Sequence, residues 1–402
     1  MTSMPRSRRH AGPALLGHAF RPFFLAGAAW AALATIAWLP MSFGEIDAPG
    51  HFAPLDWHVH EMVHGYLAAV MAGFLLTAVA NWTGRLPLRG APLALLLAAW
   101  MAGRVAMAAS AAIGPLATAI ADLSFLALLA GAVAREVVAG RNWRNLAPVA
   151  VLLLFLVANA EFHLAAAAGR PTELARRLSV AAAILLVVLF GTRIIPSFTR
   201  NWLSRARPGR MPAPHSALDR AAAAACVMAL GAWTLAPGSS LAAALMLAAA
   251  TATAIQLSRW AGERTARERL LAILHVGYAF VPLGFLLGGA ATLAPGHVPP
   301  SAGIHAWTAG AIGTMTIAMM TRVSRGHTGR ALAADTRTEA IYLLVLAAAI
   351  ARIVAAFAPD HGFALLHVAA GAWALAFLLF AFAYGPMLLR PRADAPRASP
   401  AS

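Results

Sequence analysis

The sequence is poor in the residues that stabilise soluble and secreted folds. Only one of its 402 residues is cysteine, Cys226, which excludes a disulfide framework within the chain and excludes thiolate metal clusters. Lysine is absent, and charged residues make up 11% of the chain, whereas a soluble domain has roughly 25%. A fold surrounded by water is therefore excluded, and any bound metal must take ligands other than cysteine.

Long apolar runs make up most of the chain instead. Hydrophobic residues account for 60% of it, in runs of about twenty residues separated by short polar segments. Residues 149–157 are apolar on every side, whereas the strands of a membrane barrel alternate apolar and polar residues. We predict an all-α, polytopic membrane bundle of twelve transmembrane helices. The predicted spans are 22–41, 58–80, 92–112, 116–138, 146–168, 178–198, 218–236, 241–260, 270–293, 303–321, 340–357 and 363–387.

Arginine supplies all of the basic side chains other than histidine, and its positions predict the topology. Short loops on the cytoplasmic side of a membrane carry most of the basic residues. With the N-terminus in the cytoplasm, all arginines but five fall on the cytoplasmic side. The exceptions are Arg170, Arg176 and Arg177 in an outer loop, and Arg104 and Arg352 inside spans. We therefore predict that both termini are cytoplasmic and that the membrane is a bacterial inner membrane.

This topology divides the chain into three parts. Residues 1–21 form a cytoplasmic N-terminal segment, residues 22–388 the transmembrane domain, and residues 389–402 a disordered cytoplasmic tail. The excess of 31 basic over 15 acidic residues is explained by the topology. We therefore expect membrane lipid, and no nucleic acid, as a partner.

Two short strings recur after predicted spans. Asn-Trp at 81–82 recurs at 201–202, and Thr-Gly-Arg at 83–85 recurs at 328–330. Intervals of 120 and 245 residues would suit three units of four helices, a plan that resembles the twelve-helix core subunit of haem-copper oxidases. Chance recurrence in a chain rich in glycine and arginine is the competing explanation, and the shortness of the strings favours it.

Fourteen histidines are many for a lipid-embedded chain, because an unpartnered ionisable side chain in a bilayer costs on the order of several kcal/mol. The predicted topology gathers them in an outer and an inner group. The outer group is His58, His60, His64, His163, His305 and His367, and the inner group is His18, His275 and His327. Neutral imidazole is a common ligand of haem iron, copper and zinc. We predict a metal or cofactor site in the outer half of the bundle; the alternative is that each histidine simply reaches water at the interface.

The second span carries ligands on two faces. Residues of an α-helix turn by about 100° per position, so His58 and Glu61 share one face and His60 and His64 share another. One helix can therefore serve two sites, or one site with a supporting carboxylate on its other side.

Two other functions fit parts of the pattern. Residues 60–64 read HEMVH and satisfy the zinc-protease pattern H-E-x-x-H. An intramembrane protease would also need a third zinc ligand in an Asp-Gly stretch of a later span, whereas Asp122 stands alone in its span. A transporter is the second alternative, because twelve spans are common in transporters and Arg104 and Arg352 could bind an anion.

Six longer motifs occur along nearly the whole chain. They are FRPFF at 20–24, WHVHEM at 57–62 with Gly65, GFLLTAV at 73–79 continuing to NWTGR at 81–85, LHVGY at 274–278, His305 with GAIGTM at 310–315, and MTRVSRGHTGR at 320–330. Together they resemble the NnrS family, membrane proteins associated with nitric oxide stress and denitrification and described as carrying haem and copper.

The resemblance implies cofactors, a ligand and a set of site residues. The cofactors are haem b and, as a second metal, copper, and the small-molecule ligand is nitric oxide, which is bound, detoxified or kept from cellular iron. His18 and His64 depart from the family pattern. The residues carried over are His58, His60, Glu61, His275, His305 and His327 as metal ligands, with Arg322 and Arg330 beside the cofactor.

Depth in the membrane limits how these residues combine. His60 and His305 lie at the same outer depth on the second and tenth helices, so we predict that they hold one haem axially. Arg322 and Arg330 are candidates for binding haem propionates. His275 lies about half a bilayer away, and belongs either to an inner site or to a structural hydrogen bond. No constellation of side chains fixes a reaction or an electron donor, so the sequence leaves open whether the protein is an enzyme.

Overall fold

The computed structural model describes residues 12–205 and 208–393, and these residues contain helices and no strand. Residues 1–11 of the predicted N-terminal segment 1–21 and residues 394–402 of the predicted tail 389–402 lie outside the described residues. Within the described residues, eleven helices are long and apolar enough to cross a membrane. They are α1 (Phe20–Ser42), the continuous run of α2 (Pro54–His60), η2 (Glu61–Leu67) and α3 (Ala68–Thr83), then α4 (Ala91–Ala108), α6 (Pro115–Ala139), α7 (Leu146–Ala167), α8 (Glu173–Leu203), α9 (Ala217–Leu235), α10 (Ser240–Ser258), α11 (Arg269–Leu293), α14 (Thr336–Phe357) and α15 (Gly362–Leu389). The chain is therefore a multi-pass, all-helical membrane protein.

Shorter helices complete the chain, and one continuous run of them covers the predicted tenth span. That run is α12 (Pro300–His305), η5 (Ala306–Gly313) and α13 (Thr314–His327). It is less apolar than the eleven helices, yet only Pro300 and Gly326 in it are exposed. A helix surrounded by protein needs no apolar face toward lipid, so glycine and threonine replace leucine in this run. The remaining short helices are η1 (Ala14–Gly17), α5 (Ser110–Ile113), η3 (Trp143–Asn145), η4 (Gly262–Thr265) and η6 (Pro359–His361).

The outer ends of two helices reach further than the apolar runs indicate. The second span begins at Pro54 rather than at residue 58, and proline at the first helical turn suits a helix start. The sixth begins at Glu173 rather than at residue 178. Arg176 and Arg177, which were expected in a loop, therefore belong to α8 and have fixed positions at its outer end.

The second and the tenth span both change their helical geometry directly after a histidine. His60 is the last residue of α2 and His305 the last of α12, and the next seven and eight residues, η2 and η5, form π-helix. Such wide turns are uncommon and are found frequently at functional sites. The two segments thus mark the same position on the second and tenth spans.

The helix boundaries recur at the intervals of the short sequence strings. Shifting residues 54–83 by 120 positions gives 174–203, where α8 spans 173–203; shifting them by 245 gives 299–328, where α12 to α13 span 300–327. The same shifts bring α1, α4 and α6 onto α7, α9 and α10, and onto α11, α14 and α15, with ends that differ by no more than 7 residues. Chance does not explain this agreement, so the described helices form three corresponding units, each of four helical runs.

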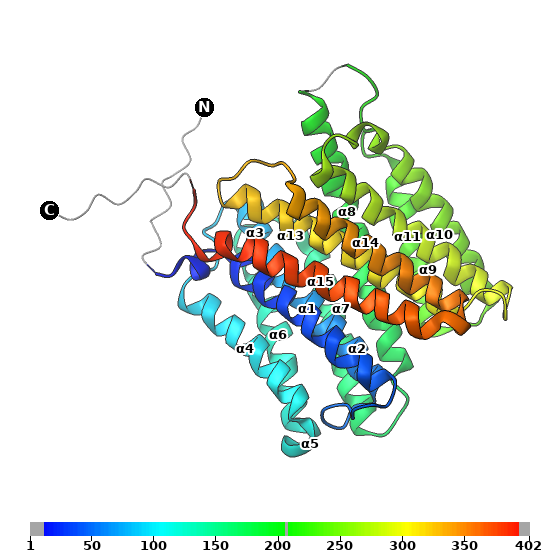
Figure 1. Ribbon diagram of the computed structural model, residues 1–402. Helices are drawn as coiled ribbons and strands as arrows, with labels where there is room; N and C mark the ends of the chain where they lie inside the picture. The colour runs from blue at the N-terminus through cyan, green and yellow to red at the C-terminus, as the bar shows by residue number, and fades with distance from the viewer. Residues whose placement is uncertain (1–11, 206–207, 394–402) are drawn as a thin grey trace.

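The units run in order around the bundle in Figure 1, from blue and cyan through green to yellow and red. The second helical runs of the three units, α2 to α3, α8 and α12 to α13, meet at the centre of the bundle. His64 of η2 lies 2.9 Å from Ser179 of α8, and the hydroxyl of Tyr66 of η2 is hydrogen-bonded to Thr316 of α13. The other spans surround these three, and α1 and α15 lie side by side along one flank. Both sites described below lie where the central helices face their neighbours.

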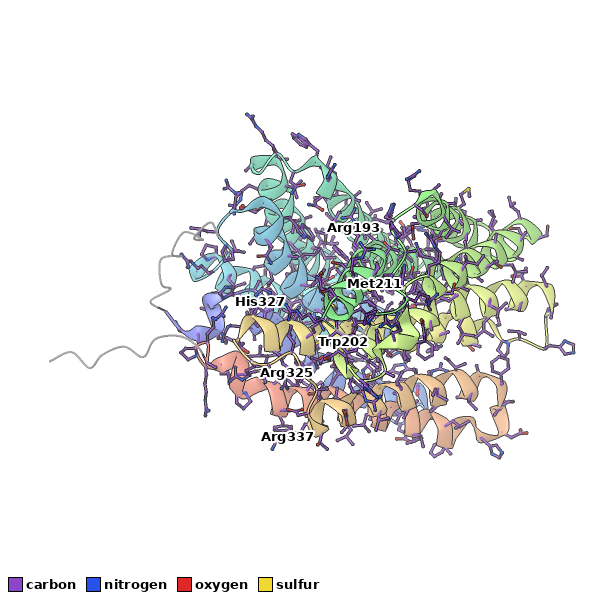
Figure 2. The ribbon with its side chains drawn as sticks, turned by 90° about the horizontal axis from the view of Figure 1, so that it is seen from above. Arg193, Trp202, Met211, Arg325, His327 and Arg337 are labelled. Atoms are coloured by element: carbon purple, nitrogen blue, oxygen red, sulfur yellow. The ribbon has the colours of Figure 1, made fainter. Side chains whose placement is uncertain are left out.

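Basic residues gather where helices of different units end. In the view from above, Figure 2 shows Arg193 of α8, Arg325 near the end of α13 and Arg337 near the start of α14 on the face turned to the viewer. His327 ends α13 on this face. This face carries the arginines that the topology assigns to the cytoplasm.

Candidate functional site

A cavity of about 510 Å³, which we call the outer cavity, lies between the second and tenth spans. Side chains of α1, α8, α14 and α15 close its walls, most of them apolar or aromatic. Two histidines, three arginines and one carboxylate also line it: His58, His305, Arg176, Arg177, Arg352 and Glu173. A largely apolar cavity with a few convergent polar groups is the usual form of a cofactor site.

His58 of α2 enters the outer cavity from one side. Its ring stacks on the indole of Trp38 of α1, with ring centres 4.1 Å apart and planes 24° apart. Its Nδ1 is buried and has no hydrogen-bond partner among the described residues. A buried polar atom without a partner is rare in proteins, and this nitrogen is free to take a further partner.

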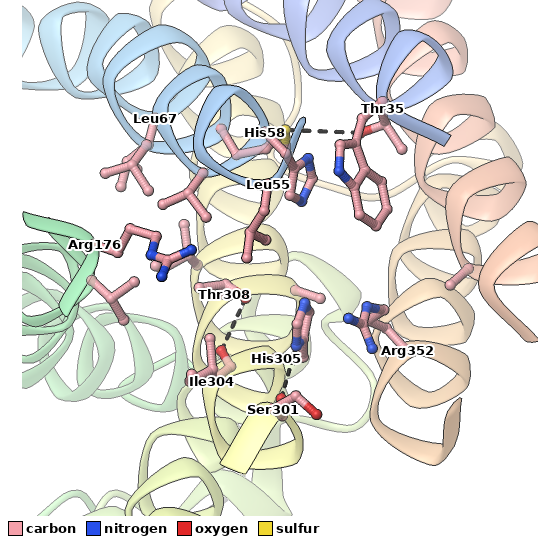
Figure 3. Close-up of a pocket in the computed structure, with 18 of the residues that line it drawn as sticks. Thr35, Leu55, His58, Leu67, Arg176, Ser301, Ile304, His305, Thr308 and Arg352 are labelled. Atoms are coloured by element: carbon pink, nitrogen blue, oxygen red, sulfur yellow. Dashed lines mark hydrogen bonds between the residues drawn. The ribbon is translucent and has the colours of Figure 1, made fainter. Parts of the chain in front are cut away.

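His305 of α12 enters the cavity from the opposite side, as Figure 3 shows. Its Nδ1 lies 2.8 Å from the carbonyl oxygen of Ser301 one turn earlier. A carbonyl only accepts, so Nδ1 carries the hydrogen and Nε2 carries the lone pair. This arrangement, with one nitrogen donating to the backbone, is common for histidines that ligate metals.

Three guanidinium groups make the cavity positive. Arg176 pairs with Asp56 at 3.3 Å and with Glu173 at 3.1 Å, and Arg177 donates to the carbonyl of Thr234 at 3.0 Å. Arg352 of α14 is half-buried beside His305 and forms no hydrogen bond or ion pair with the described residues. A cation inside a membrane protein needs a partner, so the cavity suits a ligand with negative groups at its edge.

A second site lies on the other face of α2. We call it the acid–histidine cluster, and it consists of His60, Glu61, Arg104, Asp122, Asn159 and His163. His60 is fully buried, with Nδ1 3.0 Å from Glu61 Oε1 and Nε2 3.1 Å from Asp122 Oδ2. Arg104 of α4 joins the two carboxylates, because its guanidinium donates to Glu61 at 2.6 Å and also to Asp122.

The remaining members converge on Asp122 of α6. Asn159 and His163, both of α7, approach Asp122 Oδ2 at 2.7 Å and 3.1 Å. One ligand atom from each of His60, Asp122 and His163 lies within 4.8 Å of the others. Two carboxylates facing one guanidinium leave the cluster able to accommodate a further positive charge, and imidazole and carboxylate are metal ligands.

The hydrogen bonds of the cluster argue against a zinc protease at residues 60–64. A protease of that kind uses the glutamate as general base. Here both oxygens of Glu61 are engaged, by His60 on one side and by Arg104 and Trp30 on the other. His64 instead bonds to Ser179 of α8. The geometry does not leave Glu61 free to activate water.

The inner residues implied by the motifs lie in neither site. His275 of α11 bonds through Nε2 to Thr199 of α8 at 2.9 Å, which is a structural hydrogen bond to a side chain. Arg322 of α13 stacks over Phe198, 4.4 Å from its ring centre. Arg330 donates to the carbonyl of Thr328 in its own turn. His327 packs against Phe20.

The structure also separates residues that the sequence put together. His60 and His305 do not share a cavity; His305 faces His58 across the outer cavity. Glu61 pairs with His60, although simple helical periodicity placed it with His58. His58 and His60 do point to different sites, as that periodicity indicates.

Several members were missed or read otherwise from the sequence. Trp38 and Asn159 gave no signal, because aromatic and amide side chains are ordinary in spans. Asp122 was interpreted as solitary, and Arg104 as a residue that could bind an anion in a transporter. The signal available was the coincidence of one buried cation with two buried anions, Glu61 and Asp122, in one half of the membrane.

Comparison with known protein families decides the relationship. The family model described as NnrS protein matches residues 14–392, nearly the whole chain. The chain belongs to the NnrS family. A comparison with curated proteins finds no match. Membership supports a role of this NnrS protein in the nitric oxide response.

Proposed function

We propose that this NnrS protein binds haem b in the outer cavity, with His58 and His305 as the iron ligands. The single observation that carries the proposal is that these two imidazoles face one cavity from two different helices. His60, which we first paired with His305, lies in the acid–histidine cluster and is replaced by His58.

The walls of the cavity fit the chemistry of haem. Aromatic and aliphatic side chains suit the porphyrin plane, whereas the two propionates need cationic partners. Arg176, Arg177 and Arg352 supply these, and the unpaired Arg352 gains the most from an anionic partner. They take the role that the motifs assigned to Arg322 and Arg330.

Each residue has a definite task in such a site. The Ser301 carbonyl fixes the tautomer of His305, and Trp38 fixes the plane of the His58 ring. The apolar wall excludes water and raises the local concentration of an uncharged gas that partitions into lipid. A ferrous haem held there would supply an iron that binds nitric oxide strongly, in place of one of the two imidazoles, while the other histidine would keep the haem in the cavity.

We propose that copper, the second metal implied by the motifs, binds in the acid–histidine cluster. Its donors are His60, His163 and Asp122, whose ligand atoms are close enough for one ion. Arg104 then balances the remaining negative charge of Glu61. The inner histidines, His275 and His327, take no part in this site.

We also propose the membrane arrangement in which these sites work. The run Pro300–His327 is the tenth span and completes a set of twelve, both termini face the cytoplasm, and the membrane is a bacterial inner membrane. The outer cavity then lies in the outer half of the bilayer, within reach of nitric oxide from the lipid. The protein in this setting binds or detoxifies nitric oxide, or keeps it from cellular iron.

The absorption spectrum and metal content of the detergent-purified protein test the proposal. We expect a Soret band that shifts with nitric oxide, and we expect His58→Ala and His305→Ala each to lose or shift it. His367→Ala, at an exposed outer histidine, serves as the control and keeps the wild-type band.

One further variant separates the two possible ligand pairs. His60→Asn retains a hydrogen-bonding side chain in the cluster and is expected to keep the Soret band. Loss of the band in His60→Asn but not in His58→Ala would restore the pair His60 and His305. Zinc without haem, or no metal at all, would contradict haem binding and favour a protease or a transporter.

A further inference from the structure

A second cavity, of about 350 Å³, lies beside the outer cavity between α9, α10, α11 and α12. We call it the lateral cavity. Four residues line both cavities: Trp233, Pro237, Pro300 and Ile304. The two spaces are therefore separated by single side chains, and Ile304, next to His305 in the chain, is one of them.

The side chains that line the lateral cavity offer few groups that a polar ligand could bind. Thr292 donates its hydroxyl to the carbonyl of Pro237 at 3.2 Å, and the indole of Trp307 donates to the carbonyl of Val281 at 3.1 Å. The rest of the lining is glycine, alanine, proline, methionine, isoleucine and tryptophan. A space lined by such side chains favours small apolar molecules such as xenon over polar ones.

Small residues keep this space open. The backbones of α11 and α12 touch at two glycines, because a Cβ on Gly303 would lie only 2.8 Å from the amide nitrogen of Gly288. Across the cavity, the rings of Trp233 and Phe285 hold Trp307 edge-on at 5.3 Å and 4.9 Å. Packed aromatic rings and glycine backbone therefore border a pocket with room for a diatomic molecule.

We infer that the lateral cavity admits nitric oxide and holds it beside the haem site, and this inference rests on the proposed function. Nitric oxide is small and uncharged, so it needs apolar space rather than hydrogen-bond partners. The shared wall at Ile304 gives it a short path to the outer cavity. The exposed Gly238 at the lining places the entrance at the loop between α9 and α10.

Two glycines of the same region allow a matched pair of variants. A Cβ added to Gly238 or to Gly231 meets no heavy atom within 4 Å, so a side chain can start from either position without a clash. Gly238 lines the cavity, whereas Gly231 lies on the exposed face of α9. We compare Gly238→Trp with the control Gly231→Trp.

The first experiment measures xenon binding by ¹²⁹Xe NMR in protein purified without haem. We expect wild type and Gly231→Trp to give the same xenon exchange signal, and Gly238→Trp to lose most of it. Ala291→Leu, a smaller change in the same lining, keeps the test possible if Gly238→Trp does not fold. Equal xenon binding in all variants overturns the inference, as does a lipid acyl chain found in the cavity.

The second experiment follows carbon monoxide rebinding after flash photolysis of the ferrous, haem-loaded protein. We expect Gly238→Trp to slow second-order rebinding several-fold while its Soret band stays unchanged. If the Soret band is present and rebinding keeps the wild-type rate, the lateral cavity is not the route. If no variant, wild type included, has a Soret band, the haem proposal fails and the xenon result stands alone.

Discussion

At the scale of single residues, Gly65 shows how closely the acid–histidine cluster is packed. A Cβ there would lie 2.7 Å from Trp30 Nε1, 2.8 Å from Arg104 Nη1 and 2.9 Å from Glu61 Oε2. Two of these atoms belong to the ion pair that neutralises the cluster. Glycine is therefore the residue that lets α4 and the second span approach closely enough for the pair to form.

We expect Gly65→Ala to lower the free energy of unfolding by roughly 1–3 kcal/mol, because overpacking a tightly filled site forces its neighbours apart. Thermal unfolding in detergent measures the effect. Gly131→Ala on α6 is the control, since a Cβ there meets nothing within 4 Å. Equal melting temperatures for the two variants would show that the cluster can relax around a methyl group.

The kinds of site residues could be read from the sequence, but their partners could not. Histidines at one depth indicated a metal site, and the two-residue spacing of His58 and His60 indicated two directions. Which histidine faces His305 depends on how the second and tenth spans are rotated about their axes. That rotation is set by packing around η2 and η5, and nothing in the local sequence reports a π-helix.

At the scale of secondary structure elements, α14 has a clear start signal. Asp335 accepts hydrogen bonds from the backbone nitrogen of Thr338 at 2.9 Å and from its hydroxyl at 2.7 Å. Arg325 of α13 donates to the same carboxylate at 3.2 Å. Asp335 thus caps one helix and ties it to the end of another.

We expect Asp335→Ala to lower stability by about 1 kcal/mol at neutral pH, because an N-cap is lost. Burial alone would raise the pKa of Asp335, but the bonds from Thr338 and Arg325 outweigh it and hold the pKa below 3.8. A carboxylate with a lowered pKa stabilises the fold above its ordinary pKa and loses this effect as the pH falls through its folded value.

The difference between Asp335→Ala and wild type should therefore shrink below a pH of about 3.8. Thermal unfolding over a series of pH values tests this. Asp335→Asn retains a capping side chain without the charge and should remain close to wild type at neutral pH. A difference that grows in acid would contradict the assignment.

The elements themselves followed from the apolar runs, with two informative exceptions. Apolar runs indicate contact with lipid, so they located the peripheral spans well. They placed the first residues of the second and sixth spans four and five positions too late in the chain. Charged residues continue those helices because each has a partner: Asp56 pairs with Arg176, and Arg177 donates to the carbonyl of Thr234. The buried run Pro300–His327 is less apolar for the opposite reason, since it has little lipid to face.

At the scale of the whole molecule, the two proposed metal sites lie on opposite faces of one helix and share no ligand. We therefore expect His58→Ala to lose haem and retain copper, and His163→Ala to lose copper and retain haem. Haem absorbance and metal analysis on the same samples measure both. Joint loss of both metals in a variant that still folds would show that a single site holds them.

The membrane topology can be tested by labelling introduced cysteines. Cys226 is buried in α9, so it should not react with a membrane-impermeant thiol reagent. A cysteine introduced in its presence then reports its own side of the membrane. We expect His367→Cys to be labelled in intact cells and Arg337→Cys only after lysis. The reverse pattern would invert the orientation.

The three-unit architecture also explains why the outer cavity is lopsided. Under the two shifts, His60 and His305 correspond to each other and to Val180 of α8. His305 and Val180 line the outer cavity, whereas His60 lies in the acid–histidine cluster. The third copy of the position thus carries a plain hydrocarbon wall, with two arginines about one turn before it. A planar ligand with acidic groups on one edge fits against such a wall in only one orientation, so the difference between the units gives the cavity a front and a back.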